Sequence, residues 1–175
     1  MRAKTLGAVL AGGQSARFGS DKALARLGEA SLLQHAIASL QLSCAEVLVI
    51  GREGGIADWP KPGMGPLGGI AGALRCAQAH GFEEVLSCGV DSIGLPENLL
   101  TLLSPSPAYV DSQPVIGLWP VRALADVEAI LAGDGRHSMR ALAETIAARR
   151  VKLPAQPFNI NTPQDLADLA TPDDG

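Results

Sequence analysis

The sequence predicts an α/β fold in which helices pack on a mostly parallel β-sheet. Three observations lead to this prediction. Short apolar segments typical of buried strands alternate with segments of helical period, the first apolar segment runs into a glycine-rich loop, and 47% of the 175 residues are hydrophobic. This length and composition suit one hydrophobic core, so we expect a single domain over residues 1–175.

Strands and helices alternate through the first half of the chain. Thr5–Leu10 (TLGAVL) is an apolar run and predicts a buried strand. Ser31 is a good N-cap for a helix through Gln41, in which leucine, alanine and isoleucine recur on one face. The elements expected next are a second buried strand at Glu46–Ile50, a loop at Gly51–Gly65, a helix at Leu67–His80 that Gly81 ends, a third strand at Glu84–Cys88, a loop at Gly89–Pro96, and a short helix from Pro96 to Leu103.

The second half of the chain continues with amphipathic helices and fewer strands. The turn GDGR separates two segments in which apolar residues recur with helical period. The expected elements are a strand at Val115–Trp119, helices at Val121–Leu131 and Ser138–Arg149, a short edge strand at Arg150–Leu153, and a final helix with Thr162 as its cap and Pro163 at its first position.

Charge and composition exclude several classes of protein. The net charge of -4 argues against a nucleic-acid-binding protein, which usually carries a basic excess. No apolar run approaches the roughly 20 residues of a membrane span, and we interpret the short apolar N-terminal run as a strand rather than a signal peptide. Cys44, Cys76 and Cys88 match no zinc spacing, and the histidines share no metal-binding spacing. We therefore expect reduced thiols in a cytoplasmic protein that binds neither nucleic acid nor membrane.

The stretch LAGGQSARFGSDKA, which begins at Leu10, carries the first functional pattern. Adjacent Gly12 and Gly13 let the backbone approach a ligand, and Arg17 and Lys22 add positive charge suited to phosphate. It is not a Walker A loop, because alanine rather than serine or threonine follows the lysine, and it lacks the spaced glycines of the dinucleotide-binding fingerprint. Phosphate binding is thus one interpretation, and a tight surface turn with solvated charges is the other. In a mostly parallel sheet, ligands bind beyond the carboxyl ends of the strands, and this loop leaves the first strand at that end.

Four motifs resemble one enzyme family, in the same order along the chain. LAGGQSARFGSDKALARLGEASLLQHA is similar to the signature LAGGxSxRMGxDKAL of sugar-phosphate-type nucleotidyltransferases, and most similar to that of the molybdenum cofactor guanylyltransferases, the MobA family. Asp58 followed by GPLGGI, SCGVDSIGLP around Asp91, and FNINTPQDL near the C-terminus resemble three further motifs of this family. Gly89 and Val90 depart from the Pro-Cys that normally precedes the aspartate, and Phe18 replaces the usual methionine.

The resemblance implies a fold and a reaction. The fold is a Rossmann-like three-layer sandwich of the nucleotide-diphospho-sugar transferase type. The acceptor in this reaction is molybdopterin, with or without bound molybdenum. Its terminal phosphate attacks the α-phosphorus of GTP, which forms the guanine dinucleotide cofactor and releases pyrophosphate. GTP and molybdopterin are the implied ligands, Mg²⁺ is the implied cofactor, and molybdoenzyme chaperones are candidate protein partners.

The resemblance also assigns roles to residues. Lys22 and Arg17 would hold the β- and γ-phosphates and Asp91 would bind the metal, so these are the implied catalytic residues. For Asp91 the alternative role is a cap of the following turn, for Asp58 a solvated loop carboxylate, and for the asparagines a preference for turns and caps. The implied nucleotide-binding residues are Leu10, Ala11, Gly12, Gly13, Lys22, Asp58 and Asp91, with Asp58 near the guanine or ribose, and the implied acceptor-binding residues are Asn159 and Asn161.

Two other functions stay open at this stage. One is a related nucleotidyltransferase with another nucleotide or acceptor, such as a molybdopterin cytidylyltransferase, a sugar-1-phosphate nucleotidyltransferase or a phospholactate guanylyltransferase. The other is a non-catalytic nucleotide-binding adaptor, which the altered GVDSIG loop keeps in view.

Overall fold

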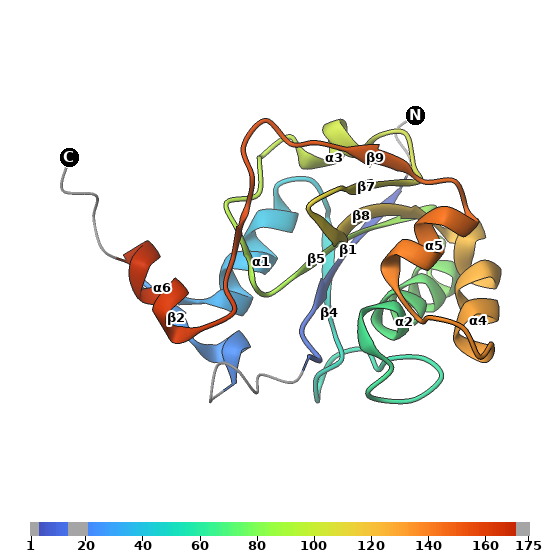
Figure 1. The fold of residues 1–175 in the computed structure, drawn as a ribbon, viewed down its shortest axis with the longest axis horizontal. Helices are drawn as coiled ribbons and strands as arrows, with labels where there is room; N and C mark the ends of the chain where they lie inside the picture. Colours follow the sequence, from blue (N-terminus) through green and yellow to red (C-terminus); the bar gives the residue numbers. More distant parts are fainter. Residues whose placement is uncertain (1–3, 14–20, 171–175) are drawn as a thin grey trace.

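A six-stranded sheet forms the centre of the described chain (Figure 1). The structure is a computed structural model and describes residues 4–13 and 21–170. The three strands β4, β1 and β5 are parallel, β8 runs antiparallel to both of its neighbours, and β9 is parallel to β7, so the expected mostly parallel sheet is confirmed. In spatial order the strands are β4 (Glu46–Ile50), β1 (Thr5–Leu10), β5 (Glu84–Gly89), β8 (Gln113–Pro120), β7 (Ala108–Val110) and β9 (Arg149–Val151).

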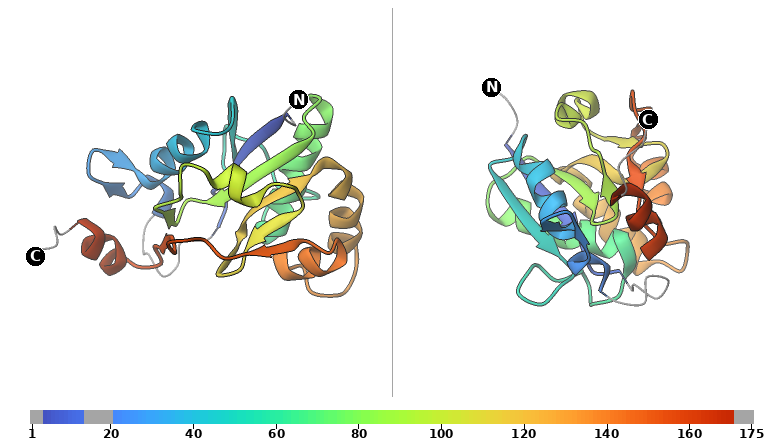
Figure 2. Two further views of the ribbon diagram at one scale, coloured as in Figure 1. Left: turned by 90° about the horizontal axis from the view of Figure 1, so that it is seen from above. Right: turned by 90° about the vertical axis from the view of Figure 1, so that its left-hand side faces the viewer.

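Helices cover both faces of this sheet, which makes three layers (Figures 1 and 2). Alternate residues of each strand point to opposite faces, so one strand serves two apolar clusters. In β1, Leu6 and Ala8 belong to the first cluster and Val9 belongs to the second. The helices on the first face are α2 (Gly65–Ala79), α4 (Leu124–Ala132) and α5 (Met139–Thr145), and those on the second face are α1 (Leu32–Gln41) and α3 (Leu99–Leu103).

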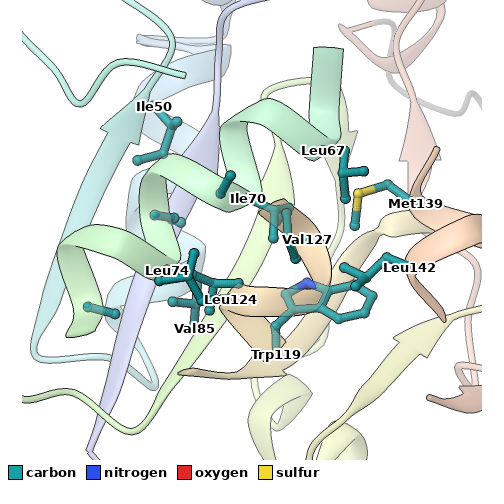
Figure 3. Packing of buried hydrophobic residues seen from close by; sticks show 14 of the residues in the cluster. Ile50, Leu67, Ile70, Leu74, Val85, Trp119, Leu124, Val127, Met139 and Leu142 are labelled. Atoms are coloured by element: carbon teal, nitrogen blue, oxygen red, sulfur yellow. The ribbon is translucent and has the colours of Figure 1, made fainter. Parts of the chain in front are cut away.

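Trp119 is a member of the first apolar cluster and packs among its leucines (Figure 3). The indole is fully buried, and its Nε1–H donates to the Ser87 hydroxyl at 2.9 Å. That hydroxyl donates in turn to the Val115 carbonyl oxygen at 2.7 Å. The polar atoms that the tryptophan brings into the core are therefore satisfied by two adjacent strands, β5 and β8, which is the arrangement that buried polar groups require.

The helix ends follow the chemistry of the sequence. Ser31 forms a capping box at the start of α1: its hydroxyl accepts from the Gln34 N–H at 3.1 Å, and its own N–H donates to Gln34 Oε1 at 2.8 Å. Helix α2 ends just before Gly81, which adopts φ +75° as expected for a glycine stop. The final helix, α6 (Pro163–Ala170), begins as predicted after Thr162, whose hydroxyl accepts from the Asp165 N–H at 3.2 Å.

Several expectations require correction. Strand β4 is only half-buried, because it is an edge strand with β1 as its one neighbour in the sheet. The helix expected over Ser138–Arg149 ends at Thr145, since Ala147 adopts φ 51° and β9 begins at Arg149. The helix expected over Val121–Leu131 opens with a 3₁₀ turn, η2 (Val121–Ala123), and α4 follows it.

Within the described residues, four short strands outside the central sheet also differ from expectation. The loop expected over Gly89–Pro96 contains β6 (Ser92–Ile93), which pairs antiparallel with β10 (Phe158–Asn159). A small hairpin of β2 (Arg26–Leu27) and β3 (Ala30–Ser31) precedes α1. Helix α6 lies beside β2, at the end of the molecule opposite α4 and α5 (Figures 1 and 2).

Three parallel strands end together. In the register of the sheet, Leu10 at the end of β1 lies opposite Ile50 at the end of β4 and opposite Gly89 at the end of β5. The loops that follow these strands therefore leave the sheet at one edge, as expected for a ligand site in an open α/β sheet. No helix within residues 4–13 and 21–170 has both the length and the apolar character needed to cross a membrane.

Replacing Ser87 with alanine is expected to lower the free energy of unfolding by about 1–3 kcal/mol, because the buried indole N–H of Trp119 loses its acceptor. Urea denaturation measures this loss. The control is Ser39→Ala, whose hydroxyl donates to the His35 carbonyl oxygen on the half-buried face of α1 and which is expected to change stability by less than about 0.5 kcal/mol. Equal losses in the two variants would contradict this account of the core.

Candidate functional site

A cleft opens at the edge where β1, β4 and β5 end. The segments 10–13, 21–23 and 89–91 contribute most of its lining, and Asp58, Ile50 and Val115 complete it together with Gly65, Pro66 and Gly69 at the start of α2. Three of the four sequence motifs thus contribute residues to the cleft, from segments that lie far apart in the sequence. Of the nucleotide-binding residues predicted from the resemblance, all seven line this cleft: Leu10, Ala11, Gly12, Gly13, Lys22, Asp58 and Asp91.

Gly12, which lines the cleft, makes a direct backbone contact with Gly51. A Cβ on Gly12 would lie 2.9 Å from the Cα and carbonyl oxygen of Gly51, and a Cβ on Gly51 would lie 2.7 Å from Gly12 Cα. The contact is fixed by the Ala11 N–H, which donates to the Ile50 carbonyl oxygen at 2.9 Å. Gly13 differs, because a Cβ built there meets no atom of residues 4–13 and 21–170 within 4 Å. Gly12 is therefore required for packing between two loops.

Lys22 and Asp91 face each other across the cleft. Lys22 belongs to the 3₁₀ turn η1 (Lys22–Leu24), and its Nζ lies 3.6 Å from Asp91 Oδ2. The two side chains are 16% and 29% exposed, so both charges are partly removed from water yet reachable from it. The positive charge of Lys22 also extends to the start of α6. There the pKa of Asp165 is lowered, first by the backbone N–H groups of Asn161 and Thr162 and to a smaller degree by the charge of Lys22.

The loop that carries Asp91 is held by the end of the chain. The Ile160 N–H donates to the Asp91 carbonyl oxygen at 2.9 Å, next to the pairing of β10 with β6. The carboxylate folds back over the end of β5, where a Cβ on Gly89 would lie 2.6 Å from Asp91 Oδ1. The glycine at this position, a departure from the family motif, thus leaves room for the carboxylate in the orientation seen here.

Asp58 lines the cleft close to the contact of Gly12 with Gly51. Its Oδ1 lies 3.2 Å from the position of a Cβ on Gly51. Burial raises the pKa of Asp58, while hydrogen bonds from the backbone N–H groups of Gly63 and Met64 act in the opposite direction. Those N–H groups precede α2, so the carboxylate is oriented by the same turn that begins the helix.

The two asparagines do not join the cleft. Asn159 lies in β10, is exposed, and lines a separate shallow hollow with Asp165 and Asp168 on α6. Asn161 precedes α6, and its backbone N–H donates to Asp165 Oδ2 at 2.9 Å. Arg17, the third predicted catalytic residue, lies outside the described residues.

Sequence reasoning missed one pair of residues at the site. Arg52, two residues beyond the end of β4, donates two hydrogen bonds to the carboxylate of Asp21, with Nη1 2.9 Å from Oδ1 and Nη2 2.6 Å from Oδ2. The pKa of Asp21 is lowered mainly by this hydrogen bonding to Arg52. The residues are 31 positions apart, and no local pattern links them. Only the register of β1 with β4 could have indicated their proximity.

The chain matches the family model described as MobA-like NTP transferase domain over residues 7–151. It is 34% identical to the molybdenum cofactor guanylyltransferase of Rhizobium leguminosarum bv. trifolii, over 95% of this chain and 92% of that protein. It is 31% identical to the molybdenum cofactor guanylyltransferase of Rhodobacter capsulatus, over 92% of both chains.

Solved structures share the fold. The molybdopterin-guanine dinucleotide biosynthesis protein A of Archaeoglobus fulgidus has a TM-score of 0.72 at 21% identity, covering 94% of this chain and 96% of that one. A 4-diphosphocytidyl-2C-methyl-D-erythritol synthase has a TM-score of 0.64 at 12% identity, covering 95% and 98%. The Rossmann-like fold of nucleotidyltransferases predicted from the sequence is therefore confirmed, and the chain belongs to the family of MobA-like NTP transferase domains.

Proposed function

We propose that this chain transfers GMP from GTP to the terminal phosphate of molybdopterin and releases pyrophosphate. One observation carries the proposal: Lys22 Nζ and Asp91 Oδ2 lie 3.6 Å apart in a cleft at the ends of three parallel strands. A cation for phosphate and a carboxylate for a metal ion are the two groups that nucleotidyl transfer requires. The names of the curated relatives in this family supply the choice of GTP and molybdopterin.

For this reaction the protein must position the two substrates and neutralise the negative charge of their phosphates. The attacking group is a phosphate, which is already anionic at neutral pH, so no side chain needs to remove a proton. The barrier comes from repulsion between the two phosphates and from the charge that develops on pyrophosphate. Lys22 and Arg17 bind the β- and γ-phosphates and stabilise that charge, and Gly13, a residue of the cleft lining without a side chain, lets the nucleotide approach the backbone.

The residues at the cleft fit a magnesium ion. Among the described residues, no group of three or more histidine, cysteine, aspartate or glutamate side chains could hold a metal. Magnesium in nucleotide sites needs only one or two carboxylates, since phosphate oxygens and waters complete its coordination. Asp91 is the carboxylate available for this role, because both oxygens of Asp21 are bonded to Arg52. When bound, Mg²⁺ neutralises phosphate charge.

Two further roles complete the proposal. Asp58 accepts hydrogen bonds from the N1–H and N2–H of guanine, a pattern that adenine does not offer. Asn159 and Asn161 bind the acceptor, on the segment whose pairing with β6 places it next to the Asp91 loop. The reaction takes place in the cytoplasm, and molybdoenzyme chaperones receive the product.

Lys22→Ala is expected to lower kcat for GMP transfer from GTP to molybdopterin by about 10²–10³-fold, the usual effect of removing one group that stabilises transition-state charge. Pyrophosphate release in the presence of Mg²⁺ measures the rate. Lys152→Ala, an exposed lysine in the segment that follows β9, is the matched control and should retain normal turnover. Normal turnover in the Lys22 variant, with its Tm unchanged, would refute the phosphate-binding role.

Asp91→Asn keeps the size of the side chain and removes its charge. We expect the Mg²⁺ concentration that gives half-maximal activity to rise by at least about tenfold, within the 10–100-fold range seen when the surroundings of a metal site are altered. Titration of pyrophosphate release with MgCl₂ measures this shift. Glu97→Gln, an exposed carboxylate after the same loop, serves as the control. An unchanged magnesium requirement would exclude Asp91 as the ligand.

A further inference from the structure

The ion pair of Asp21 with Arg52 joins two loops of the cleft. Asp21 directly precedes the turn that carries Lys22, and Arg52 lies two residues beyond the end of β4. The guanidinium contacts both carboxylate oxygens, at 2.9 and 2.6 Å, which is the forked geometry that fixes direction as well as distance. The base of Arg52 is itself held, because Gly51 N–H donates to the Ile56 carbonyl oxygen at 2.7 Å and Gly55 N–H donates to the Arg52 carbonyl oxygen at 3.0 Å.

Stability alone does not account for this pair. The side chains of Arg52 and Asp21 are 25% and 44% exposed, and exposed pairs of this kind typically contribute only about 0–1 kcal/mol. The position of the ion pair beside the Lys22 turn indicates a role in the site. Asp21 caps η1 by accepting from the Ala23 N–H at 3.2 Å, so the position of its carboxylate sets the position of the turn and of Lys22 within it.

Arg52 also balances the negative charge that Asp21 brings into the cleft. Asp21 lines the cleft, whereas Arg52 is absent from its lining. A carboxylate at this place would repel a triphosphate held by Lys22, unless its charge is balanced. Arg52 supplies that balance from outside the cleft and keeps both carboxylate oxygens engaged.

We propose that Arg52 is a positioning residue for nucleotide binding that acts through Asp21. It anchors the turn that presents Lys22 to the triphosphate, and it neutralises the carboxylate that would otherwise face the phosphates. The proposal rests on the proposed function, in that the ligand of the cleft is a nucleoside triphosphate, and it adds a residue that no motif of the sequence singled out.

Binding of GTP with Mg²⁺ tests the proposal when Arg52→Gln is made in two backgrounds. In the wild-type background the dissociation constant, measured by calorimetry, is expected to rise roughly tenfold, as for other residues that orient a ligating group. In the Asp21→Asn background the same substitution should change it less than about twofold, because additivity fails for residues that act through each other. Equal weakening in both backgrounds, or in neither, would overturn the proposal.

Arg150→Gln is the matched control for this cycle. Arg150 pairs with Asp111 at 3.4 Å on β9, at the edge of the sheet opposite β4, and its loss should leave GTP affinity and turnover unchanged. A fall in affinity as large as that of Arg52→Gln would show that loss of any surface cation weakens GTP binding, and would overturn a specific role for Arg52.

A second measurement needs no nucleotide. The Leu24 N–H donates to the Asp21 carbonyl oxygen and the Ala25 N–H to that of Lys22, both at 3.1 Å, so these two amides report on the turn. Hydrogen exchange at both should speed up in Arg52→Gln and stay unchanged in Arg150→Gln. Unchanged hydrogen exchange at these two amides in Arg52→Gln would refute the role of Arg52 in anchoring the turn. Failure of the wild-type chain to bind GTP would refute the proposed function instead, and the exchange rates would still decide the anchoring role of Arg52.

Discussion

The in-register ends of β1, β4 and β5 are the constraint on which the candidate site depends. Because Leu10, Ile50 and Gly89 lie opposite one another, the loops after these strands must share one edge of the sheet. The backbone contact of Gly12 with Gly51 then sets how closely two of the loops approach. A side chain at either position would separate them, and with them the residues that line the cleft.

The Asp91 loop and the Lys22 turn are held by contacts outside these three strands. The pairing of β10 with β6 and the bond from Ile160 N–H to the Asp91 carbonyl oxygen fix the Asp91 loop from the C-terminal segment. The ion pair of Asp21 with Arg52 fixes the Lys22 turn from the other side. The distance between the Lys22 ammonium and the Asp91 carboxylate thus depends on contacts between segments that are remote in sequence.

The local sequence pattern predicted most strands and helices, but it did not predict their burial and their neighbours as well. The apolar runs at Thr5–Leu10 and Glu46–Ile50 became strands with the expected bounds, but only the sheet order shows that the second is a half-buried edge. The end of α5 depended on the positive φ of Ala147, for which an alanine gives no signal. Motif spacing brought Lys22, Asp58 and Asp91 into one cleft, whereas Arg52 depends on strand register, and the two asparagines lie outside the cleft.

Transfer of labelled GMP from α-³²P-GTP to molybdopterin tests the central claim most directly. The chain with Mg²⁺ is incubated with molybdopterin and with labelled GTP, CTP or ATP in parallel, and the labelled dinucleotide product is quantified. The account predicts product from GTP and little from CTP or ATP, because Asp58 accepts from two guanine N–H groups. Equal transfer from CTP or ATP would contradict the guanine assignment, and absence of transfer from every nucleotide would contradict the proposed reaction itself.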